Sequence, residues 1–266
     1  MPGRSQAPLA ALYEQYYDHA RFETEQAPAA SLGKLAASFE PFRWTGRWLD
    51  LGYGEGGLLS AAESLEWHCY GVEISPQSLD YGNRRGWVVS SDADRDPRFP
   101  EAGFDVVTMI EFLEHVKDPQ SQLSAALRWL RPGGLLYLTT PNADSLNRRC
   151  LGLEWSIFKP PEHITIWTSR GLRTALSRAG FQCRRTRTEG FNPCEILSRL
   201  RRELARIQRG GREDDVAPVD RNRTAFALNQ ALSRSPLRRA IKRGINGCLS
   251  AVGIGDSLKV WAVKAE

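Results

Sequence analysis

The stretch RWLDLGYGEGG, residues 47–57, decides how this sequence folds. Its first half, residues 47–51, has the length and apolar character of a buried strand. Residues 57–65, which follow, carry apolar side chains at helical spacing. Between them lies a glycine-rich turn, where a ligand can approach the backbone closely because no Cβ intrudes. The stretch therefore predicts a strand, a ligand-binding turn and a helix, which together open a parallel α/β sheet.

Strands and helices alternate along the rest of the chain. We expect further strands over residues 69–74, 87–90, 104–110, 135–140, 181–189 and 257–264, and helices over 78–84, 119–130 and 169–179. The strand at 104–110 is apolar almost throughout, as a strand covered on both faces should be. This alternation predicts a doubly wound, Rossmann-like α/β fold.

Composition divides the chain into three parts. Residues 1–46 carry apolar stripes at helical spacing and are expected to form an N-terminal helical cap. Residues 47–190 together with 253–266 are expected to form the core, and residues 191–252 a basic helical insertion.

The glycines of the turn, Gly52, Gly54, Gly56 and Gly57, fit two kinds of cofactor site. Their spacing satisfies GxGxG, which is usual for S-adenosylmethionine, and also GxGxxG, which is usual for dinucleotides. Glu73 stands 21 residues after Gly52, at the end of the second expected strand. A carboxylate at that place can bind the ribose hydroxyls of either cofactor. The turn alone therefore leaves both cofactors open.

Later segments resemble the class I S-adenosylmethionine-dependent methyltransferases, in particular the branch that modifies small molecules, lipids and glycans. The segments that carry the resemblance are LDLGYGEG at 49–56, YGVEI at 70–74, FDVVTMIEFLEHVKDP at 104–119 and LRPGGLLYLTTPN at 130–142. The EHVKDP and LRPGG blocks are more specific than the glycine turn, and a dehydrogenase has no reason to carry them. The resemblance implies S-adenosylmethionine as the cofactor. It also implies a seven-stranded sheet whose last strand, 257–264, is antiparallel.

The resemblance further implies which residues bind the cofactor. Asp50, Gly52, Gly54 and Gly56 would surround the methionine part and the ribose, and Tyr53 would pack beside the cofactor. Glu73 is implied to bind the ribose, and Ile74, Asp92 and Ala93 are implied to contact the adenine. Ile110 and Glu111 are implied to face the methionine end and the reacting methyl group. In such a sheet all of these residues lie at the carboxyl ends of strands.

Transfer of a methyl group to a hydroxyl requires removal of a proton, for which histidine suits near neutral pH. The chain has four histidines, His19, His68, His115 and His163. His163 is our first choice, because its PPEH block borders the acceptor pocket in the resembling family, and His115 is the second. The alternatives are structural: His163 ordering a proline turn, and His115 capping a turn beside the cofactor. His68 is expected on the surface. His19 could help to cover the site, but a place on the surface of the N-terminal helix is favoured.

The net charge of +5 is concentrated in one stretch, because residues 199–246 hold 13 Lys and Arg against 5 Asp and Glu. Within it, residues 236–252 form a basic amphipathic pattern, with Leu237, Ile241, Ile245, Leu249 and Val252 on one helical face. Such a helix can pack its apolar face on the sheet, which we favour, or contact an anionic membrane surface. Nucleic acid is disfavoured as a partner, because no recognised binding module accompanies the charge.

The 41% hydrophobic and 25% charged residues are those of an ordinary globular protein. The five cysteines lack CxxC spacing, so neither a zinc site nor a disulfide framework is expected. No apolar run is long enough to span a bilayer, and the first residues do not have the pattern of a secretory signal. We therefore expect a cytoplasmic protein, with peripheral contact at the inner membrane face through residues 236–252 as an alternative.

Together these features predict an enzyme that transfers a methyl group from S-adenosylmethionine to a small molecule. A hydroxyl of a sugar or lipid-linked glycan is the leading acceptor, because IGDSLKVWA at 254–262 resembles an ending of bacterial methyltransferases that modify such molecules. The alternatives are an NAD(P)-dependent oxidoreductase and a module that binds S-adenosylmethionine without turnover.

Overall fold

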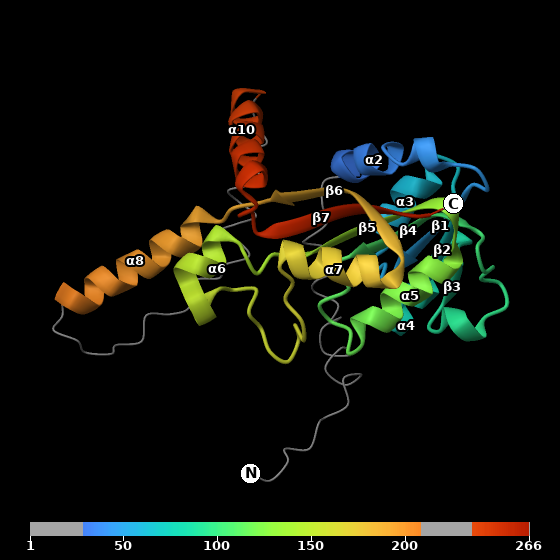
Figure 1. Ribbon diagram of the computed structural model, residues 1–266, viewed down its shortest axis with the longest axis horizontal. Helices are drawn as coiled ribbons and strands as arrows, with labels where there is room; N and C mark the ends of the chain where they lie inside the picture. Colours follow the sequence, from blue (N-terminus) through green and yellow to red (C-terminus); the bar gives the residue numbers. More distant parts are fainter. Residues whose placement is uncertain (1–28, 209–235, 266) are drawn as a thin grey trace, which may run out of the picture.

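The structure of the protein, a computed structural model, describes residues 29–208 and 236–265. The helical pattern expected before residue 29, with His19, and the middle of the basic insertion lie outside the described residues. A twisted sheet forms the centre of the described part, with helices on both faces (Figure 1).

The sheet has seven strands. They are β1 (Arg47–Leu51), β2 (His68–Val72), β3 (Val88–Ser90), β4 (Phe104–Ile110), β5 (Leu130–Pro141), β6 (Phe181–Glu189) and β7 (Ser257–Lys264). Their order is β3-β2-β1-β4-β5-β7-β6, and β7 is antiparallel to both of its neighbours. This confirms the Rossmann-like sheet with an antiparallel last strand. The order reverses at β1, which has β2 on one side and β4 on the other, and ligands bind at such a reversal.

Eight helices are described. They are α2 (Ala29–Ala37), α3 (Gly57–Glu63), α4 (Pro76–Arg85), α5 (Pro119–Trp129), α6 (Leu146–Leu151), α7 (Ser169–Ala179), α8 (Pro193–Gln208) and α10 (Pro236–Val252), with short 3-10 turns η1 (Glu40–Phe42), η2 (Ala93–Arg95) and η3 (Gly152–Glu154). The apolar sides of α2 and α3 pack on one face of the sheet, and those of α5 and α7 on the other (Figure 1).

Local sequence signals explain where the flanking helices begin and end. The side chains of Ser75, Asp118 and Thr168 accept backbone N–H groups in the first turns of α4, α5 and α7. Gly86 and Gly180 end α4 and α7 in the left-handed conformation, with φ of 80° and 99°. Glycine adopts this conformation without the cost that a Cβ imposes.

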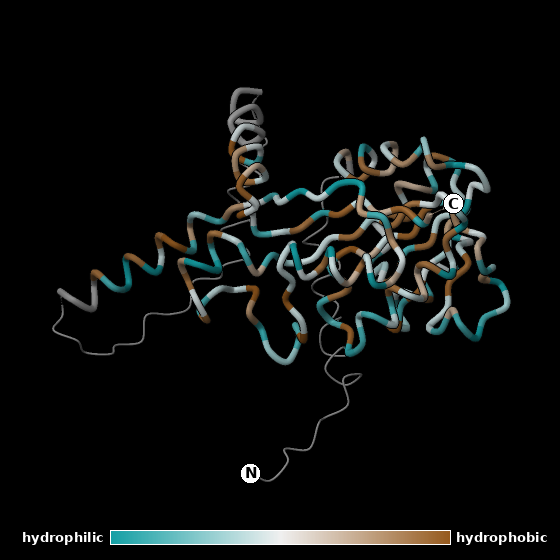
Figure 2. The backbone as a smooth tube through the Cα atoms, viewed as in Figure 1, coloured by the Kyte–Doolittle hydropathy of each residue, from teal (hydrophilic) through white to brown (hydrophobic). Residues whose placement is uncertain are grey.

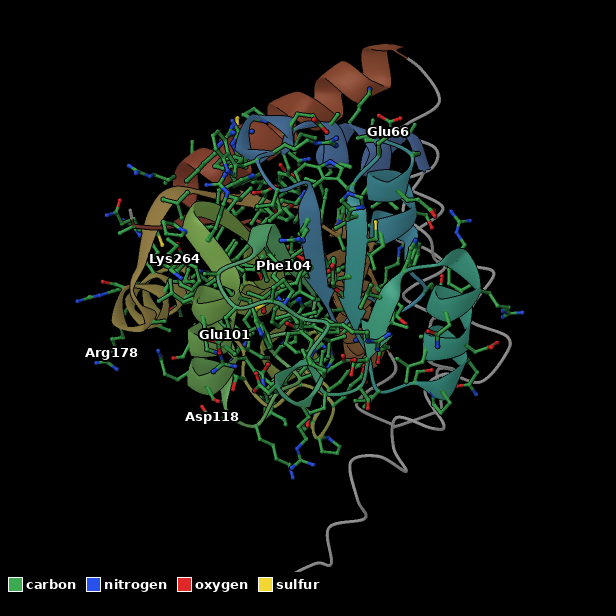
Figure 3. The ribbon with its side chains drawn as sticks, turned by 90° about the vertical axis from the view of Figure 1, so that its right-hand side faces the viewer. Glu66, Glu101, Phe104, Asp118, Arg178 and Lys264 are labelled. Carbon is green, nitrogen blue, oxygen red and sulfur yellow. The ribbon has the colours of Figure 1, made fainter. Side chains whose placement is uncertain are left out.

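Two apolar layers fill the space between the sheet and its helices. Figure 2 shows hydrophobic segments concentrated in the sheet, and Figure 3 shows side chains crowded around Phe104, which is fully buried. The layer on the α5 and α7 side includes Phe104 and Leu172, and the layer on the α2 and α3 side includes Trp48 and Phe39. The sheet is therefore covered on both faces, as the apolar strands predict.

A buried carboxylate joins the segment before β1 to the centre of the sheet. Asp105 on β4 is fully buried and accepts the backbone N–H groups of Trp44 (2.9 Å) and Gly46 (2.7 Å). Arg131 on β5 donates its Nε–H to the same carboxylate at 2.6 Å. These charged and polar contacts hold the pKa of Asp105 below its usual range, against the effect of burial.

Within the described part of the basic insertion, α8 and α10 extend away from the sheet (Figure 1). The end of α10 docks on β6, where Leu249 is buried and its carbonyl accepts the Thr188 hydroxyl at 3.0 Å. Ile245 and Val252 of the expected apolar stripe are 44% and 70% exposed. The expected docking therefore occurs, but it covers only part of the stripe that is described. Among the described helices, none combines the length and the apolar character needed to cross a membrane.

Candidate active site

A cleft lies at the carboxyl edge of the sheet, at the reversal of strand order. It consists of two cavities, of about 470 and 520 Å³, which share Gly52, Ile110 and Glu111 in their linings. These volumes lie in the range of small-molecule sites. Of the residues expected to bind the cofactor, the structure brings to this cleft Asp50, Gly52, Tyr53, Gly54, Glu73, Ile74, Ile110 and Glu111.

The glycine turn forms the floor of the cleft. Gly52 and Gly54 have φ of 71° and 53°, and a Cβ on Gly52 would lie 2.5 Å from the ring of Phe112. A Cβ on Gly54 would have no protein atom within 4 Å, so that side of the turn is open. Gly56 serves packing instead, because its Cβ would lie 2.6 Å from Trp87. The open side of Gly54 is the space that a cofactor lying against the turn requires.

Glu73 lies just after β2 and is buried beside the turn. Its carboxylate accepts the backbone N–H of Gly54 at 3.0 Å and that of Ile74 at 2.7 Å. These contacts fix the carboxylate at the cavity wall, where ribose hydroxyls can donate to it. Ile74 beside it is 54% exposed and presents an apolar surface against which a planar base can pack.

Asp50 ends a chain of hydrogen bonds that begins at Trp48. The indole N–H of Trp48 donates to the Thr108 hydroxyl at 3.0 Å, and this hydroxyl donates to Asp50 at 2.6 Å. Burial raises the pKa of Asp50 to about 7, and the neighbouring Glu73 adds to the rise, while the Thr108 bond opposes it. A positively charged ligand in the cleft would favour the ionised form of Asp50.

Tyr53 is expected to pack beside the cofactor. It borders the cleft, but its ring lies between Gly71 and Gly82 in the core. Its hydroxyl donates to the carbonyl of Ser78 at 2.7 Å. The ring therefore supports the turn from below, where its own polar group is satisfied.

Asp92 and Ala93, which are expected to contact the adenine, follow β3. The Asp92 side chain is exposed, accepts the backbone N–H of Asp94 at 3.1 Å and pairs with Arg95 at 3.3 Å. Ala93 is buried, and neither residue lines the cavities. Ser91 lines the cleft in their place. The Asp92 side chain thus caps η2, and its contact with the adenine stays a prediction.

Two acidic side chains follow β4. Glu111 lies in the cleft with a φ of 47°, a conformation uncommon for residues other than glycine, and its N–H donates to the carbonyl of Thr139 at 3.0 Å. Glu114 is fully buried and accepts the Thr140 hydroxyl at 2.9 Å. Burial and the nearby Glu111 carboxylate raise the pKa of Glu114 to about 9, and enclosure raises the pKa of Glu111.

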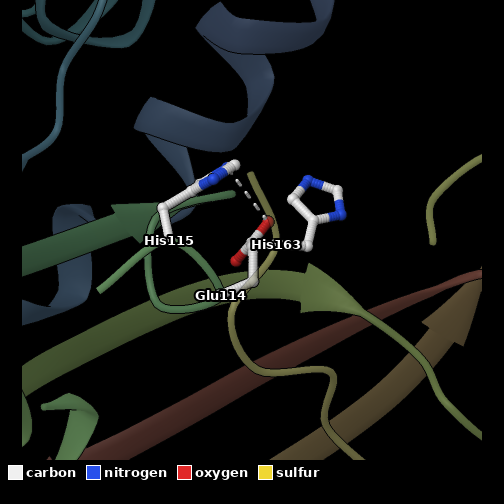
Figure 4. Close-up of side chains that lie close together, drawn as sticks. All are labelled: Glu114, His115 and His163. Carbon is white, nitrogen blue, oxygen red and sulfur yellow. Dashed lines mark ion pairs between the residues drawn. The ribbon is translucent and has the colours of Figure 1, made fainter. Parts of the chain in front are cut away.

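The two candidate base residues lie together beside Glu114 (Figure 4). The rings of His115 and His163 meet edge to face, with centroids 4.8 Å apart, and His115 Nε2 lies 3.9 Å from a Glu114 oxygen. His115 lines the larger cavity, whereas His163 is absent from the linings of both. Burial lowers the pKa of His163, and the neighbouring His115 lowers it further. His68 is exposed at the start of β2, as expected.

Each imidazole has one nitrogen fixed by a backbone carbonyl. Nδ1 of His115 lies 2.9 Å from the carbonyl of Glu162, and Nδ1 of His163 lies 2.5 Å from that of Ile157. Because a carbonyl only accepts, both Nδ1 atoms carry the proton, and the neutral ring leaves Nε2 as the acceptor.

Several cleft residues were not expected from the sequence. They are Leu32 and Leu35 from α2, Tyr137 and Thr139 from β5, and Ser257 and Lys259 from β7. The β7 residues reach this edge because an antiparallel strand begins where its parallel neighbours end. The expected antiparallel direction of residues 257–264 could have placed the start of this strand at the cleft.

Comparison with known proteins agrees with this geometry. A family model described as a methyltransferase domain matches residues 17–186. A ubiquinone biosynthesis O-methyltransferase from Marinobacter nauticus is 30% identical over 176 residues, covering 59% of this chain and 73% of that protein. A 27-O-demethylrifamycin SV methyltransferase from Amycolatopsis mediterranei is 32% identical over 136 residues, covering 48% of this chain and 50% of that protein.

Solved structures share the fold. A SAM-dependent methyltransferase from Archaeoglobus fulgidus superposes with a TM-score of 0.54 at 19% identity, covering 96% of this chain and 99% of that one. The family match spans the glycine turn, Glu73 and the residues after β4, which are the parts that form the cleft. The chain therefore belongs to the methyltransferase-domain family, and its cofactor is S-adenosylmethionine.

Proposed function

We propose that this protein methylates a hydroxyl group of a small molecule and that His115 is the general base. One observation carries the proposal: His115 lines the cleft with Nδ1 held by the Glu162 carbonyl, which leaves Nε2 as the proton-accepting atom of the neutral ring. An imidazole held in one tautomer is ready to accept a proton at a defined atom.

The chemistry divides between the cofactor and the chain. S-adenosylmethionine, when bound, supplies a methyl group that is already activated for transfer. The chain must hold the acceptor in line, exclude water and remove the hydroxyl proton. We assign the proton to Nε2 of His115. Glu114 and His163 position this ring, and the raised pKa of Glu114 keeps that carboxyl group protonated near neutral pH.

The cleft residues fit the cofactor. The open side of Gly54 gives room against the turn, and Glu73 presents a fixed carboxylate to the ribose hydroxyls. Asp50 and Glu111 supply negative charge for the cationic methionine end. We propose these cofactor contacts together with the role of His115.

Apolar side chains in both cavities of the cleft favour an acceptor with an apolar body. Leu32, Leu35, Leu58 and Tyr137 line the smaller cavity, and Phe112 and Val116 line the larger one beside His115. The names of two relatives specify O-methylation, one in ubiquinone biosynthesis and one on a rifamycin. We infer that a hydroxyl on a ring or chain of apolar character is the acceptor, and a lipid-linked sugar remains compatible with this description.

The test is a turnover assay that detects S-adenosylhomocysteine. Catechol, a long-chain alkyl phenol and free glucose serve as acceptors. We expect turnover with the phenols, and His115→Ala should lower kcat by roughly 10²–10⁴ while the affinity for S-adenosylhomocysteine stays nearly unchanged. His68→Ala, at an exposed site, is the matched control. Unchanged kcat in both His115→Ala and His163→Ala would remove histidine base catalysis. Cofactor binding without turnover would favour the non-catalytic alternative.

A further inference from the structure

A further cavity lies outside the cleft, between α7, α6 and the end of α10. Its volume is about 660 Å³, and it shares no lining residue with the two cavities of the cleft. Its lining residues are Asp144, Arg149, Ser169, Arg170, Arg173, Thr174, Ser177, Arg178, Val252 and Gly253. We call it the arginine cavity.

The sequence of α7 explains why arginines gather there. Leu172, Leu176 and Ala179 form the buried face of this helix. The opposite side of the helix carries Arg170, Arg173, Thr174, Ser177 and Arg178, which lie close to one another on the helix surface. Figure 3 shows Arg178 pointing outward from the helix. One face of α7 therefore supplies three guanidinium groups and two hydroxyls to the same wall.

The cavity carries an unbalanced positive charge. Arg149 joins the three arginines of α7, and Asp144 is the single acidic residue in the lining, which leaves a formal charge of 4 − 1 = +3. Several other surface arginines in the described ranges have acidic partners, such as Arg84 with Asp80 and Arg202 with Glu154. No ion pair within residues 29–208 and 236–265 involves any of these four. Clustered guanidinium groups of this kind are suited to a ligand with several negative oxygens.

We propose that the arginine cavity binds a phosphate or pyrophosphate ester, separately from the cofactor and acceptor. Guanidinium groups donate paired N–H bonds that match phosphate geometry, and Ser and Thr hydroxyls can donate to the remaining oxygens. The opposite wall ends in Val252, which is 70% exposed, so an apolar group attached to the phosphate would meet an apolar surface. A lipid headgroup and a soluble phosphate ester share this chemistry.

The first experiment is calorimetry with inorganic pyrophosphate on the full chain, with saturating S-adenosylhomocysteine to occupy the cleft. We expect binding to the wild type. Arg173→Gln should weaken it about tenfold to a hundredfold, because hydrogen bonds to a charged group are lost. Arg84→Gln removes the same charge from α4, outside the arginine cavity, and should leave the affinity unchanged. Melting temperatures confirm that both variants fold.

Absence of pyrophosphate binding, or an equal loss in the two variants, would overturn the proposal. A second arm distinguishes the sources by sedimentation with phosphatidylcholine vesicles that do or do not contain phosphatidic acid. Retention on phosphatidic acid that disappears in Arg173→Gln identifies a lipid headgroup. Binding of pyrophosphate without retention on vesicles identifies a soluble phosphate ester.

Discussion

Four carboxyl groups meet at one end of the sheet, those of Asp50, Glu73, Glu111 and Glu114. Burial is the main cause that raises the pKa of Asp50 to about 7 and that of Glu114 to about 9, and one neighbouring carboxylate, Glu73 and Glu111 respectively, adds to each rise. A sulfonium cofactor brings a positive charge to this group. Its binding should therefore be linked to proton release from the cleft.

Removal of the Glu73 carboxylate should weaken the binding of S-adenosylhomocysteine at least tenfold. Hydrogen bonds to a charged group contribute about 1.5–3 kcal/mol, and Glu73 also holds the N–H of Gly54 in the turn. Calorimetry of Glu73→Ala measures the change, with Asp80→Ala on α4 as the control. NAD binding tighter than that of S-adenosylhomocysteine would contradict the assignment of this carboxylate.

Glu114 should make the cofactor-free protein less stable as the pH rises. Its pKa is raised in the folded state, from 4.5 to about 9, so between these values the folded protein binds more protons than the unfolded chain. The free energy of unfolding then falls with rising pH, at up to about 1.4 kcal/mol per pH unit for one proton. Denaturant melts from pH 5 to 9 should show a smaller slope for Glu114→Gln than for the wild type. Equal slopes would mean that Glu114 is ionised in the folded protein.

Some site residues could be placed from the sequence and others could not, because different levels of structure fix their positions. Asp50, Glu73 and Glu111 could be placed from the sequence, because parallel topology brings strand ends to one edge. The inward ring of Tyr53 and the capping role of Asp92 could not, because they depend on which nearby group satisfies a side chain. The meeting of His115 with His163 likewise depends on how the loop after α6 returns over β4.

At the scale of elements, the strands were predictable where apolar runs end at glycine, proline or charged residues. β5 is the exception, because it begins at Leu130, within a segment that reads as a turn. Leu130 pairs with Phe104 across a register shift, and Gly133 takes a φ of 72° to permit it. The basic amphipathic pattern of α10 does not determine where the helix lies, because it is compatible both with packing on the sheet and with exposure to solvent.

The docking of α10 on β6 can be tested with two residues of the same stripe. Leu249→Asp places a charge at a buried position without a partner, and should lower the free energy of unfolding by about 2 kcal/mol or more. Val252→Asp introduces the same charge where the side chain is 70% exposed, and should leave the free energy of unfolding nearly unchanged. Thermal and denaturant melts compare the two. Equal effects would show that the end of α10 is not docked in solution.

At the scale of the whole molecule, one carboxylate connects the segment before β1 with two central strands. Asp105→Asn should leave Arg131 without its charged partner and turn an amide toward the N–H groups of Trp44 and Gly46. Loss of one partner of a buried ion pair costs about 3–5 kcal/mol. The exposed pair of Asp80 with Arg84 provides the contrast, since Asp80→Asn should cost less than about 1 kcal/mol. Comparable losses in the two variants would contradict the anchoring role.

The place of β7 between β5 and β6 has a consequence for how the chain assembles during synthesis. β6 leaves the ribosome well before β7, yet in the finished sheet every backbone pairing of β6 is with β7. Until residues 257–264 emerge, β5 presents an open edge and β6 has no strand beside it, and such edges invite pairing with other chains. The adjacent strands β1 to β5 therefore keep an unpaired edge at β5 until residues 257–264 have been synthesised and can enter between β5 and β6.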